Sequence, residues 1–124
     1  MKKIVCDLDQ TLTVPRGDDY SKHLPNFEII ERLRQYKNQG FSIIIYTARN
    51  MRTYQGQIGK INVHTLPGII DWLDCHQVPY DEIIVGKPWC GSDGFYVDDR
   101  AVRPSEFCSL SFDQLNELLE KECL

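Results

Sequence analysis

Two apolar runs in the first half of the chain lack the polar–apolar alternation of a half-exposed strand. They are Ile4–Cys6 ("IVC") and Phe41–Thr47 ("FSIIIYT"), and both patterns are typical of strands buried on two faces in a parallel sheet. Between them a helix is predicted from Pro25, a residue suited to a helix start, to Gly40, which is suited to its stop. The expected core positions of this helix are Phe27, Ile30, Leu33 and Tyr36. Strand, helix and strand form a right-handed crossover unit.

A second strand–helix pattern follows the first. A helix opened by Thr65, with Pro67 in its first turn, leads to short apolar runs at 81–87 ("DEIIVGK") and 94–99 ("GFYVDD"), which we interpret as two more strands. A last helix is predicted from the capping-box spacing of "SFDQ" at 111–114. The polar stretches 14–25 and 49–64 are interpreted as loops. The sequence therefore predicts an α/β fold with a mainly parallel sheet.

Length and charge narrow the classes of protein to which the chain can belong. The 124 residues suit one domain over positions 1–124, and the hydrophobic fraction of 42% is ordinary for a globular protein. The net charge of −4 argues against nucleic acid as a partner. No apolar run approaches the roughly 18 residues that span a bilayer, and "MKKIVCDLDQ" is not a signal peptide. Five cysteines without a CxxC pair argue against a disulfide framework. We expect a cytoplasmic protein without a membrane partner.

Polar residues with chemical potential follow the predicted strands. Asp7, Thr47, Lys87 and Asp98 each stand at or just after the end of an apolar run. The carboxyl ends of parallel strands form the edge at which open α/β sheets bind ligands. Four separate segments are therefore expected to place Asp, Thr, Lys and Asp at one edge of the sheet.

This set of side chains matches the needs of phosphoryl transfer. A carboxylate can attack phosphorus, and a second carboxylate can protonate the leaving oxygen and later deprotonate water. Threonine and lysine can hold the phosphoryl oxygens, and a divalent cation offsets the repulsion between two anions. Asp7, Asp9, Thr47, Lys87 and the pair Asp98–Asp99 provide groups for these tasks.

At this level of detail the chain resembles the haloacid dehalogenase-like phosphatases. Four motifs of that superfamily occur in order, as "DLDQTLT" at 7–13, the threonine of "YTARN" at 47, the lysine of "VGKPWCG" at 87 and "YVDDR" at 96–100. Several longer phrases, among them "TARNMRTY" and "GFYVDDRAVRPSEF", are similar to the small capsule-biosynthesis phosphatases of bacteria. The resemblance implies a Rossmann-like three-layer α/β/α sandwich. It further implies an Mg²⁺-dependent hydrolase of a sugar phosphate or related metabolite of surface polysaccharide synthesis.

The resemblance also implies a role for each motif residue. Asp7 would be the nucleophile that forms an aspartyl-phosphate, and Asp9 the general acid and base. Thr47 would hydrogen-bond the phosphoryl group, and Lys87 would neutralise it and steady Asp7. The expected Mg²⁺ ligands are Asp7, Asp9 through its main-chain carbonyl, Asp98 and, directly or through water, Asp99.

The sequence gives weaker indications of which residues contact the substrate and of what covers the site. The expected substrate-binding residues are Thr47, Ala48, Arg49, Lys87, Trp89 and Arg100. Arg49, Arg52, Lys60 and His64 either form a cationic wall for an anionic substrate or are a solvated polar loop. The segments 14–25 and 50–65 are too short for an inserted cap domain. An open site would admit a large substrate, or a second copy of the chain could supply a lid.

Three other functions remain open or are disfavoured at this stage. The same aspartyl-phosphate chemistry would serve a phosphotransferase or mutase. A binding-only member of the fold is a second alternative, since fold does not guarantee activity. A signalling receiver domain also uses Asp, Thr and Lys, but its phosphorylated aspartate lies mid-chain, ahead of the threonine and lysine. Between Ile29 and Thr47 this sequence has one acidic residue, Glu31, and it lies within a predicted helix.

Overall fold

The computed structural model describes residues 2–123 and divides the chain into two units, Met1–Trp89 and Cys90–Leu124. The elements of the first unit are β1 (Lys3–Cys6), β2 (Thr13–Val14), the 3₁₀ turn η1 (Tyr20–Lys22), β3 (Leu24–Pro25), α1 (Phe27–Asn38), β4 (Ser42–Thr47), α2 (Ile58–His64), α3 (Leu66–Cys75) and β5 (Glu82–Val85). Those of the second unit are α4 (Pro104–Ser109) and α5 (Phe112–Glu120).

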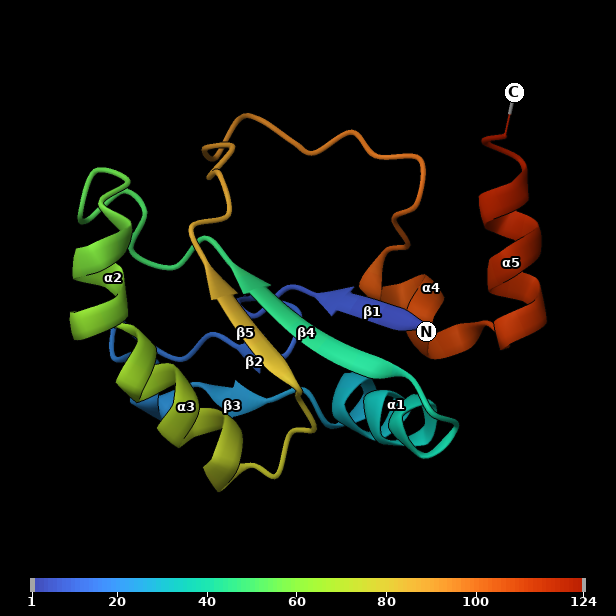
Figure 1. Ribbon diagram of the computed structural model, residues 1–124, viewed down its shortest axis with the longest axis horizontal. Helices are drawn as coiled ribbons and strands as arrows, with labels where there is room; N and C mark the ends of the chain where they lie inside the picture. The colour runs from blue at the N-terminus through green and yellow to red at the C-terminus, as the bar shows by residue number, and fades with distance from the viewer. Residues whose placement is uncertain (1, 124) are drawn as a thin grey trace. The chain divides into compact units, whose positions relative to one another are not determined.

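The first unit is built on a three-stranded parallel sheet. Strand β4 lies between β1 and β5 (Figure 1), with Cys6 opposite Ile45 and Thr47 opposite Val85. The three strands therefore end at one common edge. The predicted α/β class with a mainly parallel, Rossmann-like sheet is confirmed.

The core of this unit lies on one face of the sheet. Both crossovers step in the same direction across the order β1-β4-β5, so right-handed connections place α1 and the pair α2–α3 on the same face. Ile43 and Ile45 of β4 are fully buried there. The helices contribute further fully buried side chains, which are Ile30, Leu33, Ile69 and Leu73. Burial of each such side chain stabilises the fold by roughly 1.5–3 kcal/mol.

The first helix begins later than the sequence indicates. Asn26 caps α1 by accepting a hydrogen bond from the Ile29 backbone N–H, and Pro25 belongs to β3. The start at Phe27 sets which side chains face the sheet: Ile29 is buried, whereas Phe27 is 70% exposed. The prediction of Pro25 as the helix start and of Phe27 as a core residue is therefore wrong, because the capping side chain sets the helix start.

Both segments predicted as loops contain regular structure. Within 14–25 the chain forms a short antiparallel ribbon of β2 with β3, and η1 lies between these strands. Within 49–64 it forms α2, which the sequence analysis missed because its residues (IGKINVH) carry little helical apolar periodicity and Gln57 gives no side-chain cap. Ile61 is the one buried residue of α2. The helix is therefore held by this contact with the core and is not marked by an apolar pattern in the sequence.

The predicted strand at 94–99 is not formed. This segment is irregular in the second unit, and Phe95 and Val97 are exposed. An apolar run becomes a strand only when its backbone groups find a neighbouring strand. The last helix agrees with its prediction: Ser111 and Gln114 form the capping box at the start of α5. Helix α4, capped at Arg103, was not predicted.

The structure does not test the predicted domain organisation or the predicted cellular location. One domain over positions 1–124 remains a prediction. Among the described residues, no helix combines the length and apolar character needed to cross a bilayer. A cytoplasmic location remains a prediction as well.

Asp81 connects the start of β5 to the end of α1, and it makes stability depend on pH. Its carboxylate pairs with Lys37 and accepts a hydrogen bond from the Ile43 backbone N–H at 2.8 Å. The Lys37 hydrogen bond, followed by that from Ile43, lowers the pKa of Asp81. The folded state thus binds fewer protons at this site than the unfolded state. The stabilisation is present above the ordinary aspartate pKa, about 3.9, and is lost as pH falls towards the lower pKa of the folded protein.

We therefore expect Asp81→Asn to lower the free energy of unfolding at pH 7 and to have much less effect at pH 3. Urea unfolding of both proteins at the two pH values measures this difference. Asp71→Asn, on the exposed side of α3, is the matched control and should change little at either pH. An equal loss at both pH values for Asp81→Asn would show that the charge of Asp81 is not the cause.

Candidate active site

The turn after β1 brings two carboxylates to the edge of the sheet. The carbonyl of Leu8 accepts hydrogen bonds from the backbone N–H groups of Thr11, Leu12 and Thr13, at 3.3, 2.8 and 3.2 Å. Gln10 takes the left-handed conformation, with φ +61°, inside this turn. Leu8 and Leu12 are fully buried. Because the apolar side chains anchor the turn, Asp7 and Asp9 remain at the partly exposed edge.

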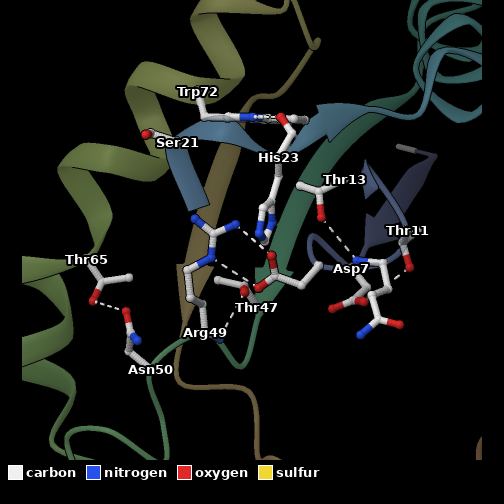
Figure 2. Close-up of polar contacts among 12 residues, drawn as sticks. Asp7, Thr11, Thr13, Ser21, His23, Thr47, Arg49, Asn50, Thr65 and Trp72 are labelled. Carbon is white, nitrogen blue, oxygen red and sulfur yellow. Dashed lines mark hydrogen bonds and ion pairs between the residues drawn. The ribbon is translucent and has the colours of Figure 1, made fainter. Parts of the chain in front are cut away.

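The Asp7 carboxylate is held at both oxygens. The Thr11 hydroxyl donates to Oδ2 at 3.2 Å (Figure 2), and the Lys87 ammonium lies 3.5 Å from Oδ1. The Asp7 side chain is 36% exposed and that of Lys87 20%. The carboxylate therefore has a fixed orientation and remains open to a ligand.

The backbone around Gly86 places Lys87 at the site. The Lys87 N–H donates to the Thr47 carbonyl at 3.1 Å, which continues the pairing of β5 with β4 by one step. Gly86 has φ +91°, a conformation that L side chains rarely adopt, and a Cβ atom there would require the end of the Ile58 side chain to move. Glycine adopts this conformation without steric cost. Gly86 therefore helps to position Lys87 at the site.

Thr47 lies at the end of β4, almost completely buried at 1% exposure. Its hydroxyl oxygen accepts a hydrogen bond from the Arg49 backbone N–H at 3.0 Å. Because the oxygen is the acceptor, the hydroxyl proton can be donated to another group. This arrangement is compatible with the predicted contact to a phosphoryl oxygen.

Arg49 forms a two-point ion pair with Asp9. Its NH2 nitrogen lies 2.7 Å from Oδ1 and its Nε nitrogen 3.1 Å from Oδ2, and the Arg49 side chain is only 5% exposed. The guanidinium carbon lies 4.1 Å from the ring centroid of Tyr20 in η1. The sequence analysis expected Arg49 to bind substrate and gave Tyr20 no role. No local pattern could reveal this contact, because Tyr20 and Arg49 meet only after the β2–β3 ribbon folds.

The other predicted site residues are placed as follows. Ala48 lies half-buried between Thr47 and Arg49, and Trp89 is 52% exposed. Asp98, Asp99 and Arg100 belong to the second unit, so their roles stay predictions. The sequence analysis gave no separate role to Thr11, which lies within the motif "DLDQTLT".

The described residues show no assembled metal site. Across residues 2–123, no group of three or more His, Cys, Asp or Glu side chains is arranged to hold a metal ion. The Asp7 carboxylate and the Asp9 main-chain carbonyl are the oxygen donors of the turn after β1 that were expected to bind Mg²⁺. Hard oxygen donors of this kind suit Mg²⁺, which also keeps waters and takes phosphate oxygens as ligands. Magnesium binding at this turn stays a prediction.

Cys6 immediately precedes Asp7 and is not a second nucleophile. Burial, with a smaller contribution from the Asp7 charge, raises the pKa of its thiol to about 12. The thiol is consequently protonated at neutral pH and unreactive. Cys6 is a buried residue of the core.

Comparison with known proteins gives a near relative and, among others, two distant fold neighbours. The chain is 63% identical to an MCSG target protein from Vibrio cholerae of known crystal structure, over 98% of this chain and 99% of that one, with a TM-score of 0.96. The chain belongs to the same family as this protein. No protein-family model and no curated protein matches the chain. The family membership supports the α/β fold and assigns no activity.

The two distant neighbours are chains of the Pnkp1/Rnl/Hen1 complex. One has a TM-score of 0.55 at 23% identity over 87% of this chain, and the other, from the Pnkp1/Rnl/Hen1 RNA repair complex, 0.53 at 22% identity over 98%. The chain spans about a third of each, 34% and 32% of their lengths. Such low identity shows the fold alone. The haloacid dehalogenase-like superfamily implied by the motifs stays a prediction.

Proposed function

We propose that the protein is an Mg²⁺-dependent phosphatase that hydrolyses a phosphomonoester through an aspartyl-phosphate at Asp7. One observation carries the proposal: a partly exposed carboxylate at the edge of a parallel sheet is fixed between the Thr11 hydroxyl and the Lys87 ammonium. An aspartate in an ordinary surface turn would not be expected to follow a buried strand end. It would also not be expected to pair with a lysine that follows another strand and is positioned by a glycine. Asp9 lies two residues away and supplies the second carboxylate.

In the first step, an oxygen of Asp7 attacks phosphorus and the bond from phosphorus to the ester oxygen breaks. Asp9 in its protonated form gives its proton to that leaving oxygen. Lys87 compensates charge on the phosphoryl oxygens, and Thr47 donates its hydroxyl proton to one of them. The products of this step are an alcohol and the acyl phosphate of Asp7.

In the second step, water attacks the phosphorus of the acyl phosphate, and Asp9 takes the proton of that water. The bond between phosphorus and Asp7 breaks, which releases inorganic phosphate and returns Asp7 as a carboxylate and Asp9 in its protonated form. Bound Mg²⁺ would supply charge compensation between the anionic substrate and Asp7. Its proposed ligands in the first unit are the Asp7 carboxylate and the Asp9 carbonyl; Asp98 and Asp99 are added on motif resemblance alone.

The proposed substrate is a small phosphorylated metabolite, with a sugar phosphate of surface polysaccharide synthesis favoured by the motif resemblance. The connections between β1 and α1 and between β4 and α2 carry no separate domain among the described residues, which favours an open site. Transfer to a sugar acceptor in place of water would use the same groups. The net charge of −4 disfavours a nucleic-acid substrate.

The test is phosphate release from sugar phosphates, nucleotides, an aryl phosphate and a phosphorylated oligoribonucleotide, with Mg²⁺ and with EDTA. We expect release that requires Mg²⁺, is abolished by EDTA and is restored by added Mg²⁺. The oligoribonucleotide is included because the two fold neighbours are chains of an RNA repair complex. A folded protein that releases no phosphate from any ester would refute the proposal.

A further inference from the structure

We propose that Arg49 and Tyr20 form a positioning pair that fixes the carboxylate of Asp9 for proton transfer. This inference rests on the proposed function, since it assigns the support of the general acid and base. It differs from the sequence-based expectation that Arg49 binds substrate. The pair joins residues from two separate segments, the turn η1 and the loop that follows β4.

The geometry of the ion pair fixes the plane of the Asp9 carboxylate. Two roughly parallel contacts, of 2.7 and 3.1 Å, join both carboxylate oxygens to two nitrogens of one planar guanidinium. A single contact would leave the carboxylate free to rotate, whereas a two-point contact does not. Lysine cannot reproduce this arrangement, because its ammonium is a single point charge.

The same geometry leaves Asp9 able to exchange a proton. Each carboxylate oxygen has two lone-pair directions, and Arg49 occupies one on each oxygen. The second direction on either oxygen remains for a proton. The Asp9 side chain is 30% exposed, whereas that of Arg49 is 5% exposed. The solvent-facing member of the pair is thus the one that would meet the leaving group, and the buried member holds it in place.

Arg49 is itself held on two sides. Its backbone N–H donates to the Thr47 hydroxyl at 3.0 Å, and its guanidinium lies over the Tyr20 ring at 4.1 Å from the centroid. Guanidinium groups stack on aromatic faces. Tyr20 is supported in turn by an edge contact with the buried His23, whose ring centroid lies 5.1 Å away. The β2–β3 ribbon therefore acts on Asp9 through Tyr20 and Arg49.

The experiment compares two esters of nearly equal size whose leaving groups differ, phenyl phosphate and 4-nitrophenyl phosphate. The better leaving group of 4-nitrophenyl phosphate needs less protonation, so loss of a positioned acid should matter less for it. The measured quantity is kcat/KM, which reports steps up to the first chemical step and not hydrolysis of the intermediate. Arg49→Lys should lower kcat/KM about 100-fold for phenyl phosphate and only several-fold for 4-nitrophenyl phosphate.

Tyr20 provides the second variant and its own conservative rescue. Tyr20→Leu removes the aromatic face and should produce the same bias between the two esters with a smaller loss. Tyr20→Phe keeps the ring and should behave as the original protein. Arg34→Lys on α1 and Tyr80→Leu near the start of β5 are controls for the same changes of side chain outside the site, and both should leave the ratio between the esters unchanged.

The outcomes separate this inference from the function on which it rests. If the original protein hydrolyses both esters and Arg49→Lys lowers kcat/KM equally for each with a raised KM, Arg49 binds the phosphoryl group and the inference is overturned. An unchanged ratio in both Arg49→Lys and Tyr20→Leu overturns it as well. If the original protein, folded and supplied with Mg²⁺, releases no phosphate from either aryl ester or from any other ester of the panel, the proposed function fails first and the inference falls with it.

Discussion

Asp7→Asn is expected to lower the rate of phosphate release by more than about 10³-fold, since loss of a nucleophile removes the covalent step outright. The fold should survive, because asparagine has the same shape and its side-chain oxygen can still accept the Thr11 hydrogen bond. The ion pair with Lys87 is partly exposed, so its loss should cost no more than about 1 kcal/mol of stability. Initial rates with Mg²⁺ and thermal unfolding of both proteins measure the two effects.

Asp9→Asn is the matched control for this prediction. It retains the nucleophile and removes only the acid and base, so the phosphorylated chain should form from 4-nitrophenyl phosphate and persist. Intact-mass measurement should detect the phosphorylated chain in Asp9→Asn and not in Asp7→Asn. Substantial turnover by Asp7→Asn, or a phosphorylated chain in that variant, would exclude Asp7 as the site of covalent attack.

Lys87→Met is expected to lower kcat/KM by about 10²–10³-fold, the usual effect of removing one group that stabilises transition-state charge. Methionine keeps most of the side-chain length and loses the ammonium that lies 3.5 Å from Asp7 Oδ1. The loss should fall on both kcat and KM, because the ammonium faces the phosphoryl group before and during its transfer. Steady-state kinetics with an aryl phosphate gives both values.

Lys87→Arg tests whether charge alone explains this effect. It restores the cation and should recover part of the activity, limited by the longer and wider guanidinium. Lys121→Met, at the C-terminal end of α5 in the second unit, should change neither constant. If Lys87→Arg recovered no activity while both variants were folded, charge compensation would not explain the role of Lys87. Its effect would then be assigned to the placement of the backbone.

The strands of the sheet were predictable because each carries its own signal. "IVC" and "FSIIIYT" are continuous apolar runs, and the structure has β1 and β4 there. "DEIIVGK" likewise contains β5. The run "GFYVDD" has a similar composition but no strand. A strand depends on a hydrogen-bonding neighbour, which local composition does not reveal.

The candidate site was predictable to the extent that it depends on strand ends. Asp7, Thr47 and Lys87 follow β1, β4 and β5, and parallel pairing brings these ends together whatever the loops do. Loop contacts are different. The ion pair of Arg49 with Asp9 spans forty positions of sequence, and Tyr20 reaches Arg49 only through the ribbon of β2 with β3. Neither pairing leaves a periodic or compositional trace.

By itself the sequence determined the α/β class, the three parallel strands and three residues at their common edge, Asp7, Thr47 and Lys87, because apolar runs and the residues that end them are local properties. The fourth predicted strand, at 94–99, is not formed. Tertiary structure alone decided what each polar side chain does at that edge. In the folded chain, Thr11 and Lys87 contact the Asp7 carboxylate. Arg49 pairs with Asp9, and the Tyr20 ring stacks on the Arg49 guanidinium. Such contacts depend on the direction in which folded segments approach one another, and hydrogen bonds and ion pairs form only at distances and angles that the complete fold sets.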